Sequence, residues 1–341
     1  MTAKHTFLYK LVCFTAILAF CVVLMGAYTR LRDAGLGCPD WPGCYGHVIV
    51  KNIPHQTPGY SLTEQNIATH KAWFEMIHRY LAGTLAFLII VIILKAWSIY
   101  FSEKKFLLFP KLMLMLVIFQ AALGRWTVTL KLLPPVVMLH LLGGMSLTVL
   151  LTLFAVQLKN FPQKFSPKDC LRFKWWALLG LGLLFIQIML GGWTSANYAS
   201  LACTDFPYCH GELIPNLNFH QAFSVLDKIG INYQGGQLAE SARITIHMTH
   251  RFGAEIVGIY WLLLCLFFLG VGRSLILFRF GILILLLLFI QISLGIINIV
   301  YLLPLANAVA HNAVATLLFV SIASLTYCFF SKHIETPINN A

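Results

Sequence analysis

Long apolar segments alternate with short polar connections along the whole chain. Each segment reaches the roughly 20 residues that an α-helix needs to cross the hydrocarbon core of a bilayer. The pattern therefore predicts eight transmembrane helices and an all-α membrane protein. The expected bounds are Phe7–Thr29, Trp73–Tyr100, Leu107–Thr129, Val136–Leu158, Trp175–Ser195, Ile244–Val271, Ile276–Leu302 and Ala308–Phe330.

Composition points to the same class of protein. Of the 341 residues, 59% are hydrophobic and only 11% are charged. In a soluble domain about a quarter of the residues are charged. A soluble protein is therefore excluded, and the lipid bilayer is the expected surroundings.

The net charge of +12 does not indicate nucleic-acid binding, because the basic residues follow a topological pattern. Alternate connections hold Lys4, Lys10, Lys104, Lys105, Lys111, Lys159, Lys164, Lys168, Arg172, Lys174, Arg273 and Arg279. The intervening connections hold Asp33, Asp40, Glu64, Asp205, Glu212, Asp227 and Glu240. This positive-inside distribution predicts that both termini lie in the cytoplasm. No Arg- and Ser-rich presequence precedes the first helix, so we expect a bacterial cytoplasmic membrane.

The two halves of the chain resemble each other. Residues 26–46 align without gaps on residues 191–211, and the stretch from His78 matches the stretch from His250. The pattern predicts two parallel repeats of four helices, related by an axis along the membrane normal. We place the halves at residues 1–160 and 161–341.

Every odd-numbered predicted helix carries a glycine near its outer end. Tight helix packing explains each glycine alone, but four equivalent positions favour a shared cavity wall that a flat ligand or a neighbouring helix can approach. The four glycines are Gly26, Gly124, Gly191 and Gly295.

Every even-numbered predicted helix carries a histidine near its outer end. A single membrane histidine is often a hydrogen-bonded packing residue, but ionisable groups in a bilayer are costly and usually functional. Two histidines in each half suit two axial ligands of one heme iron. Zinc is less favoured, because its sites take three or four nitrogen or sulfur ligands. The four histidines are His78, His140, His250 and His311.

Charged residues beside these histidines differ between the halves. Arg79 and Arg251 directly follow two of them; they can extend to the interface, pair with heme propionates, or do both. Glu75 lies three residues before His78 on the same helical face, whereas its counterpart in the second half is His247. A carboxylate in one half only predicts that this half performs a reaction; a solvated interfacial glutamate is the alternative.

A further carboxylate, Glu255, lies inside the sixth predicted helix. We expect it to pair with a polar neighbour and assign it no role.

Together these features resemble the heme A synthase family over nearly the whole chain. The resemblance rests on eight helices in two halves, a cysteine pair in the first outer loop of each half, the stretch Glu75-Met-Ile-His78-Arg and histidines on all four even helices. It implies oxidation of a ring methyl of heme O to the formyl group of heme A, through a hydroxymethyl stage. The product equips terminal cytochrome oxidases.

The resemblance also implies a division of roles. Heme O would bind between His78 and His140, and a permanent heme b between His250 and His311. Glu75 would stand near the methyl group, stabilising positive charge or positioning water. The implied partners are heme O, a membrane electron acceptor such as a quinone, and heme O synthase.

Two other functions also account for the histidines. A non-catalytic diheme cytochrome b would pass electrons from a quinol, and a heme carrier or exporter would use outward-facing histidines. The diheme cytochrome does not explain why Glu75 occurs in one half only, nor why each half has a cysteine pair.

The cysteine pairs Cys38/Cys44 and Cys203/Cys209 each span a C-x5-C stretch. Such a pair suits a disulfide, a metal site or a redox device. Because positive-inside counting puts all four on the outer face, where thiols oxidise, we expect two local disulfides that brace lids over the heme pockets. A metal site lacks spare ligands. Whether the first bridge also takes part in electron transfer stays open.

Overall fold

The computed structural model describes residues 3–50, 62–101, 103–159, 165–224, 231–270 and 274–331. Lys164, Asp227 and Arg273, which entered the topology prediction, lie outside these residues. Within them the chain is helical, without a β-strand. The helices are α1 (Ala3–Leu31), α2 (Leu62–Tyr100), the 3-10 helix η1 (Lys104–Leu107), α3 (Leu108–Thr129), α4 (Pro134–Leu158), α5 (Pro167–Ala196), α6 (Phe219–Ala222), α7 (Glu240–Gly270), α8 (Leu275–Val300) and α9 (Leu305–Phe330).

Eight of the described helices are long and apolar enough to cross a membrane, which confirms the predicted spans. The chain is a multi-pass membrane protein. α5 begins at Pro167, earlier than the predicted Trp175, because Ser166 caps it by accepting the Asp169 N–H. The short α6 was not predicted, since a single turn leaves no apolar period.

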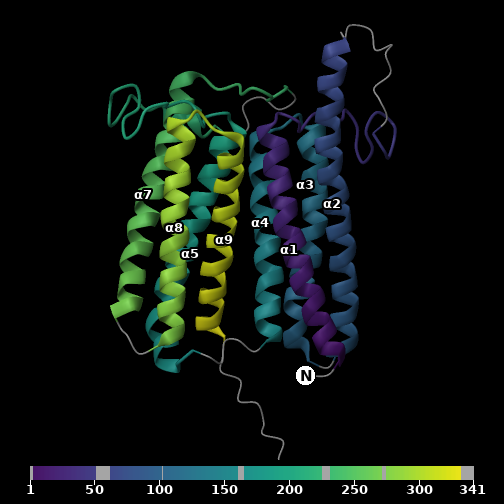
Figure 1. The fold of residues 1–341 in the computed structure, drawn as a ribbon, viewed down its shortest axis with the longest axis vertical. Helices are drawn as coiled ribbons and strands as arrows, with labels where there is room; N and C mark the ends of the chain where they lie inside the picture. The colour runs from purple at the N-terminus through teal and green to yellow at the C-terminus, as the bar shows by residue number, and fades with distance from the viewer. Residues whose placement is uncertain are drawn as a thin grey trace, which may run out of the picture.

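The helices form two bundles that lie side by side (Figure 1). α1 to α4 make the first bundle, around a core that includes Leu8 and Phe154. α5, α7, α8 and α9 make the second, around Phe173 and Trp261. The bundles meet where α4 packs against α5 and α9, and where α1 packs against α9.

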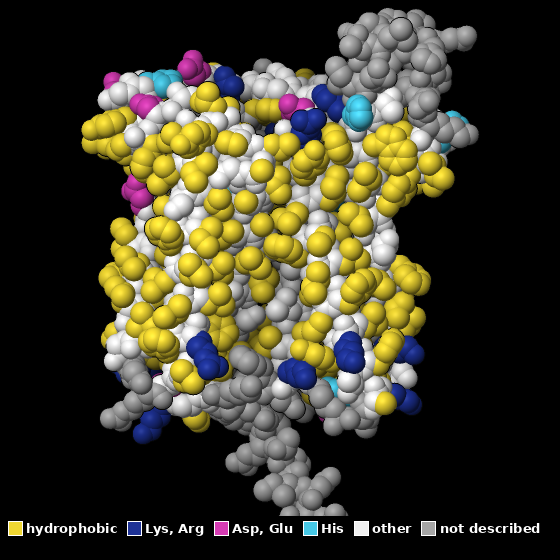
Figure 2. All heavy atoms as spheres, viewed as in Figure 1, with side chains coloured by type: hydrophobic (Ala, Val, Ile, Leu, Met, Phe, Trp, Pro, Cys, Tyr) yellow, Lys and Arg dark blue, Asp and Glu magenta, His cyan; other side chains and the backbone are white. Residues whose placement is uncertain are grey.

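The outer surface of the bundles matches a bilayer. Figure 2 shows hydrophobic side chains covering the middle of the molecule, with most Lys and Arg near the end that carries the chain's N-terminus. The apolar side chains in the middle can face lipid, so they need no burial inside the protein. The basic side chains at one end agree with the positive-inside pattern predicted from the sequence.

Four helices end in the same way, which extends the internal repeat to the backbone. At the ends of α1, α3, α5 and α8 an N–H donates to the carbonyl five residues earlier: Ala34 to Thr29, Leu132 to Thr127, Ala199 to Thr194 and Leu303 to Asn298, at 2.9, 2.8, 2.9 and 2.7 Å. The residue before each donor is left-handed although it is not glycine, with φ of 49°, 48°, 55° and 55° at Asp33, Lys131, Tyr198 and Leu302.

One expectation is wrong. Glu255 is exposed on α7 and has no hydrogen-bond or ion-pair partner among the described residues. The helix turns this side chain outward, away from the bundle interior where a polar partner was expected.

Candidate functional site

The four glycines make room for the four histidine rings. A Cβ atom on each glycine would have a histidine Cε1 as its nearest neighbour. The distances are 2.9 Å for Gly26 and His78, 3.4 Å for Gly124 and His140, 3.0 Å for Gly191 and His250, and 3.3 Å for Gly295 and His311. The equivalent glycines therefore allow each odd helix to approach the imidazole of its neighbour.

In the first bundle the two histidines face one another. The ring centroids of His78 and His140 are 6.3 Å apart, with the ring planes at 87°. Two imidazoles on opposite sides of one metal ion would have ring centres about 6 Å apart, because each metal–nitrogen bond is about 2 Å long. The Nδ1 atoms of both rings are buried without a partner among the described residues. The pair fits two axial ligands of one heme iron.

Both histidines line a cavity of about 510 Å³. This volume lies in the range of small-molecule and cofactor sites. Apolar side chains dominate the wall, and Glu75 and Arg79 also line it. The second bundle closes one side, with Gly192 and Ser195 of α5 and Asn312 of α9.

In the second bundle, glutamines contact the histidines. Gln187 Nε2 lies 3.0 Å from His250 Nδ1 and donates to the His250 carbonyl at 2.9 Å. Gln291 Nε2 lies 3.2 Å from His311 Nε2. Each glutamine comes one turn before the glycine that packs on the same histidine. The repeat contained these glutamines, but the sequence alone did not assign them to the histidines.

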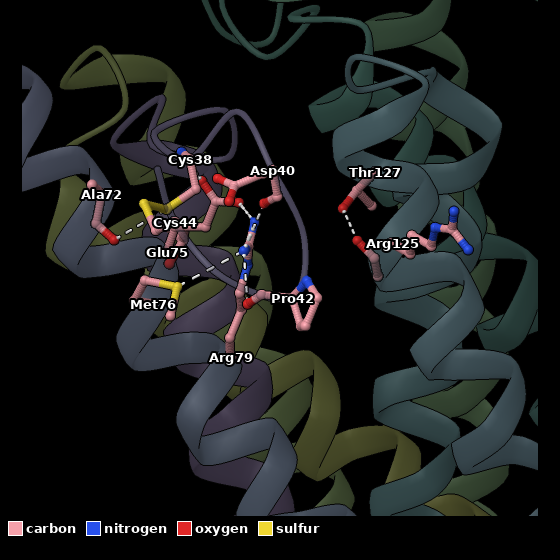
Figure 3. Close-up of polar contacts among 12 residues, drawn as sticks. Cys38, Asp40, Pro42, Cys44, Ala72, Glu75, Met76, Arg79, Arg125 and Thr127 are labelled. Carbon is pink, nitrogen blue, oxygen red and sulfur yellow. Dashed lines mark hydrogen bonds and ion pairs between the residues drawn. A yellow bond between two sulfur atoms is a disulfide. The ribbon is translucent and has the colours of Figure 1, made fainter. Parts of the chain in front are cut away.

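Glu75 joins the cavity to the first cysteine loop. The Cys38 N–H donates to its Oε2 at 2.8 Å, and Arg79 donates to its Oε1 at 2.5 Å. The residue is 5% exposed, so its carboxylate is not the solvated interfacial group of the alternative interpretation. Figure 3 shows Glu75, Arg79 and the cysteine pair converging on one end of α2.

His247 occupies the corresponding place in the second bundle. Its Nδ1 accepts the Cys203 N–H at 3.3 Å, and the residue is 4% exposed. The same backbone amide is therefore held by a carboxylate in one half and by an imidazole in the other.

Both cysteine loops are closed by a disulfide. The sulfur atoms are 2.05 Å apart in Cys38–Cys44 and 2.04 Å apart in Cys203–Cys209. Trp41, inside the first loop, lines the cavity, so this loop forms part of its outer wall.

An aspartate in each loop accepts two backbone N–H groups. Asp40 accepts those of Tyr45 and Gly46 at 2.6 and 2.8 Å. Burial raises the pKa of Asp40, but the Gly46 and Tyr45 N–H groups together outweigh it, so this pKa lies below its usual value. In the second loop Asp205 does the same with His210 and Gly211, and its pKa is lowered chiefly by the Gly211 N–H.

The two arginines beside the histidines hold the loops. Arg79 donates to the carbonyls of Asp40, Pro42 and Gly43 at 2.9, 3.2 and 2.5 Å. In the second half Arg251 donates to the carbonyls of three loop residues, Cys203, Asp205 and Tyr208. This bracing was not predicted, because nothing in the sequence indicates which carbonyls a guanidinium meets. Pairing of Arg79 and Arg251 with propionates stays a prediction.

The α6 segment covers the outer end of the second half. The Trp193 indole N–H donates to the Ala222 carbonyl at 2.9 Å, and Phe223 stacks on the Trp193 ring. The Asn218 N–H, at the start of α6, donates to Thr245 of α7 at 2.7 Å. These contacts hold the α6 segment down on the second bundle.

Comparison with known proteins identifies relatives along almost the whole chain. A family described as COX15-CtaA, cytochrome oxidase assembly protein, matches residues 9–323. A heme A synthase of Shewanella oneidensis is 45% identical over 328 residues, which cover 94% of this chain and 96% of that protein. A heme A synthase of Alkalihalophilus pseudofirmus is 30% identical over 60% of this chain and 64% of its own length. One of Shouchella clausii is 27% identical over 65% and 69%.

Proposed function

The chain belongs to the heme A synthase family of cytochrome oxidase assembly proteins, and from this membership we propose how its two halves divide the reaction. It is an enzyme whose substrate is heme O. The first half, residues 1–160, binds heme O and oxidises one ring methyl to the formyl group of heme A through a hydroxymethyl stage. The second half, residues 161–341, holds a permanent heme b.

The observation that supports this division is that only the first half has a carboxylate at this place. Glu75 lines the same cavity as His78 and His140, whereas the second half has His247 at that place. A fixed negative charge in an apolar cavity stabilises positive charge that develops on a nearby carbon. The Cys38 N–H and Arg79 keep the carboxylate in one position. Glu75 is the catalytic residue in this proposal, either through this charge or by orienting water.

The histidines hold the iron atoms. His78 and His140 ligate the iron of the substrate, and the apolar cavity wall receives the macrocycle and its farnesyl tail. His250 and His311 ligate heme b, which when bound supplies one-electron redox chemistry. Gln187 contacts His250 at Nδ1, which keeps this ring in place and leaves Nε2 for the iron, as suits a group that does not leave.

Location and partners follow from charge and chemistry. We place the protein in a bacterial cytoplasmic membrane with both termini in the cytoplasm, since on the face that Figure 2 shows most basic side chains lie at the N-terminal end of the bundles. Both cysteine loops then face an oxidising compartment. A membrane quinone accepts the electrons, and heme O synthase delivers the substrate.

Expression in a host that makes heme O tests the proposal. Pigment extracted from cells with the wild-type protein should contain heme A. Glu75→Gln removes the charge at constant shape and should lower heme A about a hundredfold, while heme b stays bound. Glu255→Gln, which removes an exposed carboxylate of the second half, is the matched control and should leave heme A unchanged.

The same measurement decides between the proposal and its alternatives. Heme b without heme A in the wild-type cells would favour a diheme cytochrome b. Heme A that persists in Glu75→Gln would contradict the catalytic role of this residue. Heme O bound and released without conversion would favour a carrier.

A further inference from the structure

Arg30 stands in the last turn of α1, close to the first histidine pair. It lies four residues after Gly26, the glycine that packs against His78. Residues four apart share one face of a helix, and four residues advance about 6 Å along the axis. Arg30 lines the same cavity as His78 and His140. A cation is thus present one turn outward from the proposed position of the iron.

The second half holds this guanidinium in place. Arg30 Nη2 donates to the Ser195 carbonyl at 2.7 Å, and its Cζ lies 3.9 Å from the centre of the Tyr198 ring. The Tyr198 hydroxyl donates to the Asp33 carboxylate at 2.9 Å, which fixes the ring in turn. A side chain held on two sides loses little further entropy when it binds a ligand.

Arg30 still has donors to offer. Its Nε is buried and forms no hydrogen bond with any described residue. Its Nη1 reaches Asp33 only at 3.5 Å, the limit for a hydrogen bond. A guanidinium has five N–H donors, and a buried donor without an acceptor is costly. Arg79, by contrast, is committed to Glu75 and three loop carbonyls.

We infer that Arg30 binds a propionate carboxylate of heme O, an inference that rests on the proposed function. The propionates are the only anionic groups on the edge of the macrocycle, and a guanidinium fork matches a carboxylate. With the iron between His78 and His140, this edge points one turn outward. Anchoring it turns one particular ring methyl toward Glu75. Arg30 is therefore a positioning residue that selects the methyl to be oxidised.

Binding of heme O and of its dimethyl ester to the purified, heme-b-containing protein tests this. The ester lacks the carboxylates but keeps the ring and the tail. The wild-type protein should bind heme O about tenfold or more tightly than the ester. Arg30→Gln should weaken heme O binding about tenfold and leave ester binding unchanged. Absorbance titration measures the dissociation constants of heme O and of the ester without turnover.

Arg125→Gln is the matched control. Arg125 is exposed near the outer end of α3, and Figure 3 shows its side chain pointing away from the Glu75 cluster. Its loss should change neither constant. Arg30→Lys keeps the charge without the fork and should give an intermediate loss for heme O alone.

Three results would overturn the inference. Equal affinity of the wild-type protein for heme O and for the ester would show that no carboxylate is anchored, a result that needs no variant to fold. Equal weakening of both ligands by Arg30→Gln would show a structural role. Unchanged heme O binding by Arg30→Gln would exclude Arg30 while the proposed function stands. A wild-type protein that binds neither ligand would instead overturn the proposed function itself.

Discussion

The outer loops of the two halves are built alike, but the side chain beneath each loop differs. In both, a disulfide closes the loop, an arginine donates to loop carbonyls and an aspartate accepts two N–H groups. The Cys38 N–H meets the carboxylate of Glu75, whereas the Cys203 N–H meets the imidazole of His247. Since the scaffold is shared, any difference in chemistry between the halves must come from the few side chains that differ.

The histidines show a second difference. Gln187 contacts His250 through its side-chain amide, but the equivalent position one turn before Gly26 holds Val22, whose side chain has no donor or acceptor for His78. A ligand held by an amide suits a permanent group, while a ligand without this support suits a substrate that must leave.

Replacing Glu75 with the histidine found at the equivalent place in the second half should have the largest effect on heme A formation. Glu75→His gives the first half the side chain of the second. The imidazole can still accept the Cys38 N–H, but the negative charge is lost, so heme A formation should fall about a hundredfold or more. Heme b content per protein should not change. Substantial heme A in cells with this variant would show that the chemical difference between the halves lies elsewhere.

Filling the glycine beside a histidine should have the next largest effect. Gly191→Ala places a methyl 3.0 Å from His250 Cε1, so the ring must shift, and heme b retained after purification should fall about tenfold. Gly182→Ala, on the same helix with nothing within 4 Å, is the control. Comparable heme loss from both variants would mean that a change in helix stability, and not a shift of the His250 ring, causes the loss.

Removing or adding a glutamine beside a histidine ring should have the smallest effect. Gln187→Ala should shift the reduction potential of heme b by about 40 mV, the equivalent of one hydrogen bond of about 1 kcal/mol. Val22→Gln should give His78 a similar contact and slow the release of product. Redox titration and product-release rates measure the two effects. An unchanged potential in Gln187→Ala would remove the glutamines from the comparison.

The features that could be predicted are those that repeat. Eight spans follow from segment length, and the four histidines stand out because equivalent helices carry them at equivalent places. The family resemblance used the same repeated positions, and the comparisons confirm it. The disulfide bonds agree with what cysteines on an oxidising face predict.

The features that could not be predicted are contacts that no repeating pattern in the sequence indicates. Arg30 meets Ser195 and Tyr198, which lie far away in the chain. The end of α8 matches the other three through a backbone bond to Asn298, which requires no particular side chain. The early start of α5 was signalled by Ser166, a cap that the count of apolar residues overlooked.

The contact between Arg30 and Ser195 has an evolutionary consequence. The two residues are 165 positions apart, as are Asp33 and Tyr198, and this is the shift that aligns residues 26–46 on residues 191–211. Each residue thus meets its own copy, as happens only on a two-fold axis. An arginine in both copies would place two guanidinium groups face to face, where they would repel. The two copies differ in this chain: one is Arg30, and the other, Ser195, accepts from it through its backbone carbonyl.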